Sequence, residues 1–161
     1  MAVGKTTLGR ELAAHLALPF VDLDERVVQS AGRSIPELFE QEGEAGFRAR
    51  ELRALTEALA GPRFVLALGG GALHSPGAPE QVTARARLLM LWAPFAELSP
   101  RLGAGPGRPL QAEAEARFDR RAPLEARIGE RVDLSGLSAS AALTALLEVV
   151  ARPGAPGVAV G

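Results

Sequence analysis

The run from Gly4 to Thr7 leads into residues 8–16, whose apolar side chains have helical spacing. A phosphate-binding loop ends in Gly-Lys-Thr at the start of a helix. There the unpaired N–H groups of the first turn and the helix dipole bind a phosphate. In such a loop Lys5 reaches the β- and γ-phosphates and the Thr6 hydroxyl binds Mg²⁺. The full pattern also has a glycine five residues before Gly4, which this sequence lacks. A glycine turn that caps an ordinary helix is therefore the alternative.

Acidic residues and glycines follow two further apolar segments. Residues 20–24 predict a short buried strand that ends in Asp22 and Asp24, and residues 64–68 predict another that runs into a glycine triplet, 69–71. We expect the two acids to point to opposite faces and to serve two separate roles, although one of them could simply cap the next helix. Glycines let a ligand approach the backbone closely, but a plain turn also explains an isolated triplet.

The elements that would position these residues alternate between strand and helix. The continuous apolar segments 64–68 and 87–93 are typical of parallel strands that helices cover on both faces. Between the predicted strands at 20–24 and 64–68 the spacing of apolar residues predicts helices, one of them beginning after an N-cap at Ser34. This alternation predicts an α/β fold with a doubly wound parallel sheet. We expect one domain over residues 1–151, a mobile Gly/Pro-rich loop at about 99–111 and a flexible tail at 152–161.

Composition narrows the classes of partner. The chain has 161 residues and a net charge of -1, so it has no basic excess with which to bind nucleic acid or a membrane surface. It has no cysteine, which excludes disulfides and thiolate metal sites, and no apolar run long enough to span a bilayer. We expect a cytoplasmic protein that acts on small molecules.

A phosphate loop normally follows a strand, yet the first element visible in this sequence is already a helix. Without that strand its neighbours would leave buried backbone groups unpaired, at about 1–3 kcal/mol each. Summed over a strand, this cost rivals the roughly 5–15 kcal/mol that stabilises a whole domain. We therefore expect Met1 to be an internal methionine preceded by about ten further residues, enough for a strand.

Seven short segments occur in order along the chain: 4–13, 20–24, 32–39, 43–48 with Glu51, 69–71, 108–110 and 121–124. Together they resemble the shikimate kinase family, small monomeric kinases of aromatic biosynthesis, from residue 1 to about residue 147. The resemblance implies a three-layer α/β/α fold of the nucleoside-monophosphate-kinase type, with residues 99–111 as a mobile lid. It also implies transfer of the γ-phosphoryl group of MgATP to the 3-hydroxyl of shikimate, giving shikimate 3-phosphate and ADP, on the route to chorismate.

The resemblance assigns roles by position in the matching segments. It implies that the catalytic residues are Lys5, Asp24 and Arg108. The nucleotide would be bound by Gly4, Lys5, Thr6, Thr7, Arg101 and Arg108, and Mg²⁺ by Thr6 and Asp22. Shikimate would be bound by Asp24, Arg48, Gly69, Gly70, Gly71 and Arg121.

The residues themselves leave simpler explanations for the two substrate arginines. Arg48 has helix spacing to Glu44 and Glu51 and could form an ordinary surface ion pair. Arg121 lies in a segment crowded with other arginines. A guanidinium nevertheless suits a cyclic hydroxy acid, because it can hold a carboxylate with two parallel N–H bonds.

Two departures and two alternatives remain. Glu125 stands where the family usually has tyrosine, and the segment between Arg108 and Arg121 is short. A related kinase of a small carboxylate, such as gluconate kinase, would use a similar set of residues. A catalytically inactive relative that only binds ligand is the other alternative, although Lys5, Thr6, Asp22, Asp24 and Arg108 are all retained.

Overall fold

The computed structural model describes residues 3–102, 111–152 and 157–161. Its strands are β1 (Phe20–Asp22), β2 (Val65–Ala67), β3 (Ala86–Trp92), β4 (Glu130–Asp133) and β5 (Gly157–Val160). Its α-helices are α1 (Lys5–Leu16), α2 (Leu23–Ala31), α3 (Ile35–Leu59), α4 (Ala78–Arg85), α5 (Phe95–Leu98), α6 (Gln111–Ile128) and α7 (Ala139–Val150). Two 3₁₀ helices, η1 (Ala72–His74) and η2 (Ser99–Leu102), complete the described elements.

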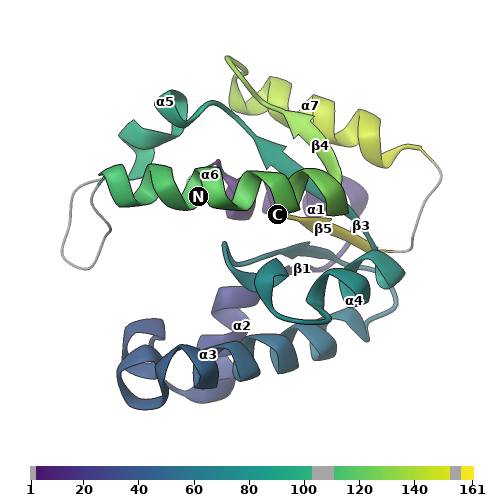
Figure 1. Ribbon diagram of the computed structural model, residues 1–161. Helices are drawn as coiled ribbons and strands as arrows, with labels where there is room; N and C mark the ends of the chain where they lie inside the picture. The colour runs from purple at the N-terminus through teal and green to yellow at the C-terminus, as the bar shows by residue number, and fades with distance from the viewer. Residues whose placement is uncertain (1–2, 103–110, 153–156) are drawn as a thin grey trace.

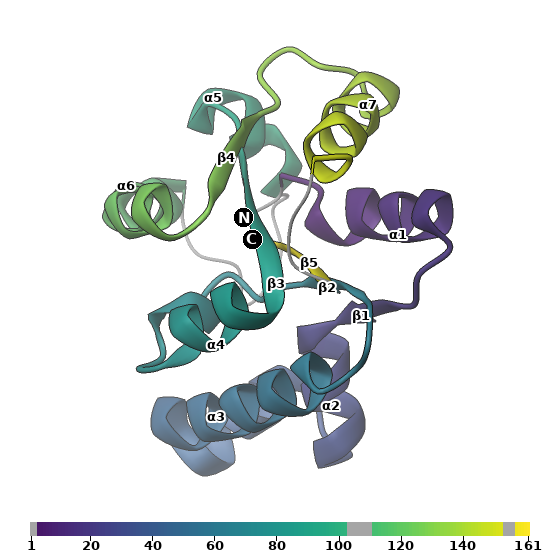
Figure 2. The same ribbon diagram turned by 90° about the vertical axis from the view of Figure 1, so that its right-hand side faces the viewer.

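The five strands form one parallel sheet in the order β1-β2-β5-β3-β4. Figure 2 shows α1 and α7 on one face of the sheet and α2, α3 and α4 on the other. Each face has its own cluster of buried apolar side chains, because strands covered on both sides bury both sets of alternating residues. The predicted three-layer α/β/α fold is confirmed. No helix in the described ranges is long and apolar enough to cross a membrane.

Strand β5 overturns part of the predicted flexible tail at 152–161. Gly157–Val160 lies in the middle of the sheet, where Ala159 pairs with Leu66 of β2 on one side and with Leu88 of β3 on the other. The prediction was wrong there because the composition of the tail hides a short apolar run, whose three side chains are all buried. The pairing that we expected from a strand ahead of the phosphate loop is made by β5 in this structure. Residues 153–156 lie outside the described ranges.

Local sequence accounts for two helix boundaries. The Ser34 hydroxyl accepts a hydrogen bond from the Glu37 N–H at 3.5 Å, while the Glu37 carboxylate accepts one from the Ser34 N–H at 2.7 Å, so the predicted cap is a full capping box. Strand β1 ends earlier than predicted, at Asp22, because the Asp22 carboxylate accepts hydrogen bonds from the Asp24 and Glu25 N–H groups and starts α2.

Figure 1 shows how these elements frame one side of the molecule, with α6 running above α3 and the carboxyl end of the sheet between them. In parallel α/β sheets ligands bind at the carboxyl ends of the strands. Of the predicted lid at 99–111, residues 103–110 lie outside the described ranges, and Ser99–Leu102 forms η2.

Placing a charge inside β5 tests its structural role. Ala159 is fully buried, so Ala159→Asp puts an unpaired carboxylate in the core, and we expect a loss of several kcal/mol of unfolding free energy. The exposed Ala84→Asp in α4 is the control and is expected to change stability by about 0.5 kcal/mol or less. Urea unfolding followed by circular dichroism measures both. Equal stability of the two variants would contradict the central placement of β5.

Candidate active site

The head of α1 has the conformation of a phosphate-binding turn. Gly4 precedes the helix with φ 93° and ψ 22°, a left-handed conformation that glycine adopts without steric cost, and its carbonyl accepts the Leu8 N–H at 2.8 Å. Lys5, Thr6 and Thr7 form the first turn. All four residues line one cavity, which is closed on its other side by Asp22, Asp24, Leu68, Gly69 and Gly70.

Thr6 and Asp22 come together from different elements. The Thr6 hydroxyl donates a hydrogen bond of 2.7 Å to Asp22 Oδ2, while Asp22 Oδ1 caps α2. The contact fixes the carboxylate against the head of α1, and it leaves two oxygen donors of the kind that Mg²⁺ prefers beside the phosphate-binding turn. Among the described residues no cluster of three or more acidic or histidine side chains could hold a metal ion by itself.

Asp24 does not occupy the position that the strand pattern predicted. It lies in the first turn of α2, not on a strand, and it lines the same cavity as Asp22 and Lys5. The prediction that the two acids face opposite sides was wrong: residues two apart on a strand share a face, and here the chain turns into a helix after Asp22. Burial raises the pKa of Asp24 above its usual range and the charge of Asp22 raises it further, whereas Lys5 and Arg48 lower it.

Arg48 forms the ion pairs that helix spacing allowed, and one of them is buried. Its Nη1 lies 2.6 Å from Glu51 Oε2 and its Nη2 lies 3.5 Å from Glu44 Oε1. Glu51 is only 2% exposed, and its burial raises the pKa of the carboxyl group while the Arg48 hydrogen bond lowers it. The buried carboxylate therefore holds the guanidinium in one orientation, a stronger constraint than a surface pair provides.

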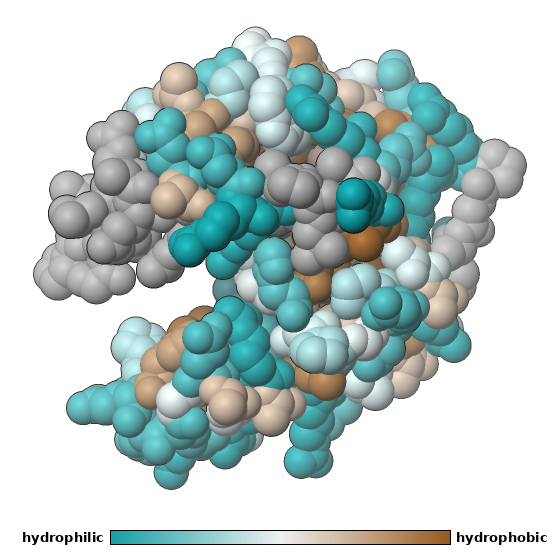
Figure 3. Space-filling view, viewed as in Figure 1, coloured by the Kyte–Doolittle hydropathy of each residue, from teal (hydrophilic) through white to brown (hydrophobic). Residues whose placement is uncertain are grey.

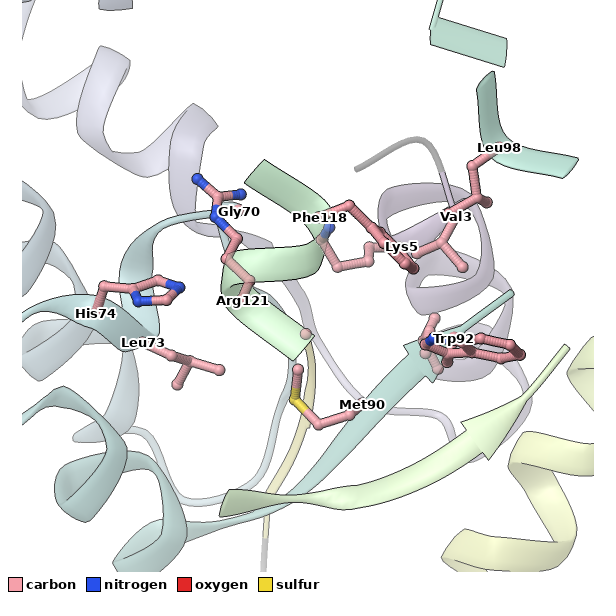
Figure 4. Close-up of a pocket in the computed structure, with 13 residues that line it drawn as sticks. Val3, Lys5, Gly70, Leu73, His74, Met90, Trp92, Leu98, Phe118 and Arg121 are labelled. Carbon is pink, nitrogen blue, oxygen red and sulfur yellow. The ribbon is translucent and has the colours of Figure 1, made fainter. Parts of the chain in front are cut away.

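The glycine triplet lies against three of these side chains. A Cβ atom on Gly69 would lie 2.5 Å from Asp24 Oδ1, and one on Gly70 would lie 2.9 Å from Arg121 Nη1. One on Gly71 would collide with the Arg48 guanidinium, 2.6 Å from Nη1. Figure 4 shows Arg121 extending from α6 toward Gly70. The absence of side chains at 69–71 is thus what lets Asp24, Arg48 and Arg121 converge on one stretch of backbone.

Arg48 and Arg121 share a second cavity of about 720 Å³ with Gly71. It is also lined by Phe39, Glu44, His74, Ser75, Pro76 and Arg120. The triplet separates this cavity from the one at Lys5 and Asp24, and Figure 3 shows the surface hollowed between the α6 side and the α3 side of the molecule. Two guanidinium groups on one side of the triplet and a lysine on the other can hold two anionic molecules next to each other.

Sequence reasoning placed most of these residues, but it treated Glu51 only as a possible surface partner of Arg48 and gave it no role in the site. Its signal was available, because Glu51 lies three residues after Arg48 on a helix face that carries Ala54, Leu55 and Ala58, all of them buried. Two predicted residues cannot be located in the site: Arg108 lies outside the described residues, and for Arg101 only the backbone position in η2 is described.

The comparisons with known proteins agree with this geometry. A family model described as shikimate kinase matches residues 1–148. Shikimate kinase of Psychrobacter sp. (strain PRwf-1) is 37% identical over 142 residues, which cover 84% of this chain and 79% of that protein. Shikimate kinase of Stenotrophomonas maltophilia (strain R551-3) is 42% identical over 110 residues, which cover 68% of this chain and 61% of that protein.

Solved structures show the same likeness. Shikimate kinase from Acinetobacter baumannii in complex with shikimate has a TM-score of 0.86 at 30% identity, covering 93% of this chain and 88% of that chain. The enzyme from Bacteroides thetaiotaomicron has a TM-score of 0.85 at 27% identity, covering 94% of both chains. With a family model that spans nearly the whole sequence, and a sheet and cavity that fit it, the chain belongs to the shikimate kinase family.

Proposed function

We propose that this protein transfers the γ-phosphoryl group of ATP to the 3-hydroxyl of shikimate, giving shikimate 3-phosphate and ADP. One observation supports this most directly. Asp24 lies between the lysine of the phosphate-binding turn and the two arginines, with the glycine triplet as the shared floor. A hydroxy acid whose carboxylate is held by the arginines would present a hydroxyl to Asp24 and Lys5.

The nucleotide side is built from the head of α1. The N–H groups of the first turn and the Lys5 ammonium would hold the terminal phosphates of ATP, with Gly4, Thr6 and Thr7 around them. The Thr6 hydroxyl and the Asp22 carboxylate fit a Mg²⁺ ion, which binds through one or two carboxylates, waters and substrate phosphates. When bound, the ion would neutralise phosphate charge.

The acceptor side is built on α2, α3 and α6. Arg48, oriented by Glu51, and Arg121 would bind the shikimate carboxylate, since guanidinium groups hold carboxylates through paired N–H bonds. Gly69, Gly70 and Gly71 would bring the backbone against the ring. Asp24 would then accept a hydrogen bond from the 3-hydroxyl and fix the direction of its attack.

In the transfer step the 3-oxygen forms a bond to the γ-phosphorus while the bond to the bridging oxygen of ADP breaks. Asp24 takes the hydroxyl proton, and the raised pKa of its carboxyl makes it a better proton acceptor than an exposed aspartate. Lys5 stabilises charge on the phosphoryl oxygens. We assign the same task to Arg108 as residues 99–111 close over the site, and adenine contact to Arg101.

Two further properties stay proposals from the sequence and the family: a monomeric state and a cytoplasmic location. Sedimentation of the purified protein tests the first. A coupled ADP-release assay with shikimate and with gluconate tests the choice of acceptor. Turnover with gluconate alone, or binding of shikimate without turnover, would replace the proposed activity by one of the two alternatives.

Lys5 is the only lysine in the chain, which makes its role easy to isolate. We expect Lys5→Met to lower kcat by about 10²–10³-fold, because one preorganised charge on the phosphoryl oxygens is lost. Arg10→Met is the matched control, since Arg10 is exposed on the same helix and pairs with Glu25. An acyl-phosphate ATP probe should label Lys5 in the parent protein, and excess ATP should protect it. Full activity of Lys5→Met would disprove the assignment.

Arg48→Ala is expected to raise KM for shikimate by about 10- to 150-fold, the loss of a charged hydrogen bond of about 1.5–3 kcal/mol. KM for ATP should change less than about twofold, because Arg48 lies across the glycine triplet from Lys5. Arg50→Ala, which removes a neighbouring arginine that pairs with Glu42, should leave both constants unchanged. Steady-state kinetics with each substrate varied makes the comparison. An unchanged shikimate constant in Arg48→Ala would exclude it from the carboxylate site.

Asp24→Asn is expected to lower kcat by about 10²–10⁴-fold while making the folded protein more stable at pH 7. The reason is the sign of the shift: a raised pKa means that the folded protein binds the Asp24 proton more tightly than the unfolded chain. The stability due to this group is therefore present below the ordinary value of 3.8 and is lost as pH rises through the folded pKa. The gain in Asp24→Asn should shrink as pH falls through that range.

Urea unfolding of the parent and the variant between pH 3.5 and 7 measures this difference. Asp133→Asn supplies a control of opposite sign, because hydrogen bonds from Ser135 lower the pKa of Asp133 in the folded state. That variant should be less stable than the parent at pH 7. Destabilisation by Asp24→Asn at neutral pH would contradict the buried environment assigned to this carboxyl.

A further inference from the structure

Strand β5 reaches the proposed nucleotide site from the opposite end of the sequence. A phosphate loop of the strand–loop–helix kind follows directly on the strand that supports it. Here the strand in the middle of the sheet is Gly157–Val160, which follows α7. Gly161, the next residue, lines a small cavity together with Val3 and Lys5, and Figure 4 shows Lys5 and Val3 on the rim of this cavity above Met90.

Helix α1 is seated on β5. A Cβ atom on Gly9 would lie 3.3 Å from Val160 Cγ2, so the helix backbone runs almost in contact with this strand. Val158 and Val160 belong to the same buried cluster as Leu8 and Leu12 of α1. Ala159 faces the other way, into the cluster under α3 and α4. The direction of α1, and with it the position of Lys5, therefore depends on the α1-facing side chains of β5.

The carboxyl end of β5 also ties together the two neighbouring strands. The Val160 carbonyl accepts the Leu68 N–H at 2.9 Å, immediately before Gly69. Gly161 donates to the Leu89 carbonyl at 2.9 Å and accepts from the Leu91 N–H at 3.1 Å. One short segment is thus bonded to the strand that carries the glycine triplet and to the strand that ends at Trp92.

We propose that Val160 and Gly161 are positioning residues for the nucleotide: they support the head of α1 from the centre of the sheet and hold Lys5 at its distance from the glycine triplet. The inference rests on ATP binding at the head of α1, as proposed above. A misplacement of about 1 Å at a phosphoryl-transfer site can cost about 10²-fold in rate, so such support has a measurable effect.

Gly161 is the position at which this can be tested with little damage to the sheet. A Cβ atom there would lie 2.8 Å from Met90 Sδ and 3.0 Å from Met90 Cε, the flexible end of a side chain that lines the cavity with Lys5. Gly161→Ala and Gly161→Val should therefore fold and shift the carboxyl end of β5 away from Met90, and with it the surface on which α1 packs, in graded steps. Ala159→Gly is the matched control, because it weakens the same face of the same strand without adding an atom beside the cavity that Lys5 lines.

Calorimetric titration of the full-length variants with ATP and, separately, with shikimate measures the effect, and thermal unfolding reports stability. We expect Gly161→Val to weaken ATP binding at least tenfold and Gly161→Ala less, with shikimate binding within twofold of the parent. Ala159→Gly should lower Tm by roughly 2–4 °C and leave both affinities within twofold. A purely structural strand would not separate the two ligands in this way.

The inference is overturned if both Gly161 variants bind ATP like the parent, or if Ala159→Gly loses ATP affinity as much as Gly161→Val does. If Gly161→Val does not fold, the ATP affinity of Gly161→Ala decides the question in the same way. A parent protein that binds no ATP overturns the proposed function and this inference together. A parent that binds ATP, alongside Gly161 variants that bind it equally well, overturns the inference alone.

Discussion

The backbone pairing of β5 is the constraint on which the rest of the structure depends. A strand in the middle of a parallel sheet satisfies the hydrogen bonds of both neighbours, and each buried group left unpaired costs about 1–3 kcal/mol. Val158 donates to the Phe64 carbonyl and Gly161 to the Leu89 carbonyl, both at 2.9 Å. With these bonds in place β2 and β3 lie at fixed separation, and the glycine triplet that follows β2 has a defined position relative to α1.

The second organising feature is the packing of charged side chains against the backbone of the glycine triplet. Asp24, Arg48 and Arg121 each approach one glycine of the triplet more closely than a Cβ atom would allow. Buried charges need compensation, and Arg48 supplies it for the buried Glu51 carboxyl. Burial raises the pKa of the Asp24 carboxyl in spite of Lys5 and Arg48 nearby. The proposed proton acceptor and the proposed anion-binding arginine thus lie against the same crowded segment.

Short-range sequence signals predicted the parts of the site that depend on local chemistry. Gly4 before Lys5 marked a left-handed turn at a helix head, and Ser34 marked a capped helix, because both depend on neighbouring residues alone. The same reasoning failed between Asp22 and Asp24. This sequence is compatible both with a continuing strand and with the start of a helix. The Asp22 side chain favours the helix, because it accepts hydrogen bonds from two backbone N–H groups of the next turn.

The sequence by itself determined the fold class and the family and predicted the residues of the proposed site, because apolar periodicity and the order of short motifs are properties of the chain. Tertiary structure alone decided that Gly157–Val160 is the central strand and not a tail, that Thr6 bonds Asp22, and that Glu51 is buried beneath Arg48. The first two join residues far apart in the sequence, and the burial of Glu51, whose pairing with Arg48 helix spacing allowed, depends on what packs around α3. The physical reason is that the hydrogen bonds of a strand, a hydroxyl or a carboxylate can be made by any suitable group that the fold brings close to it.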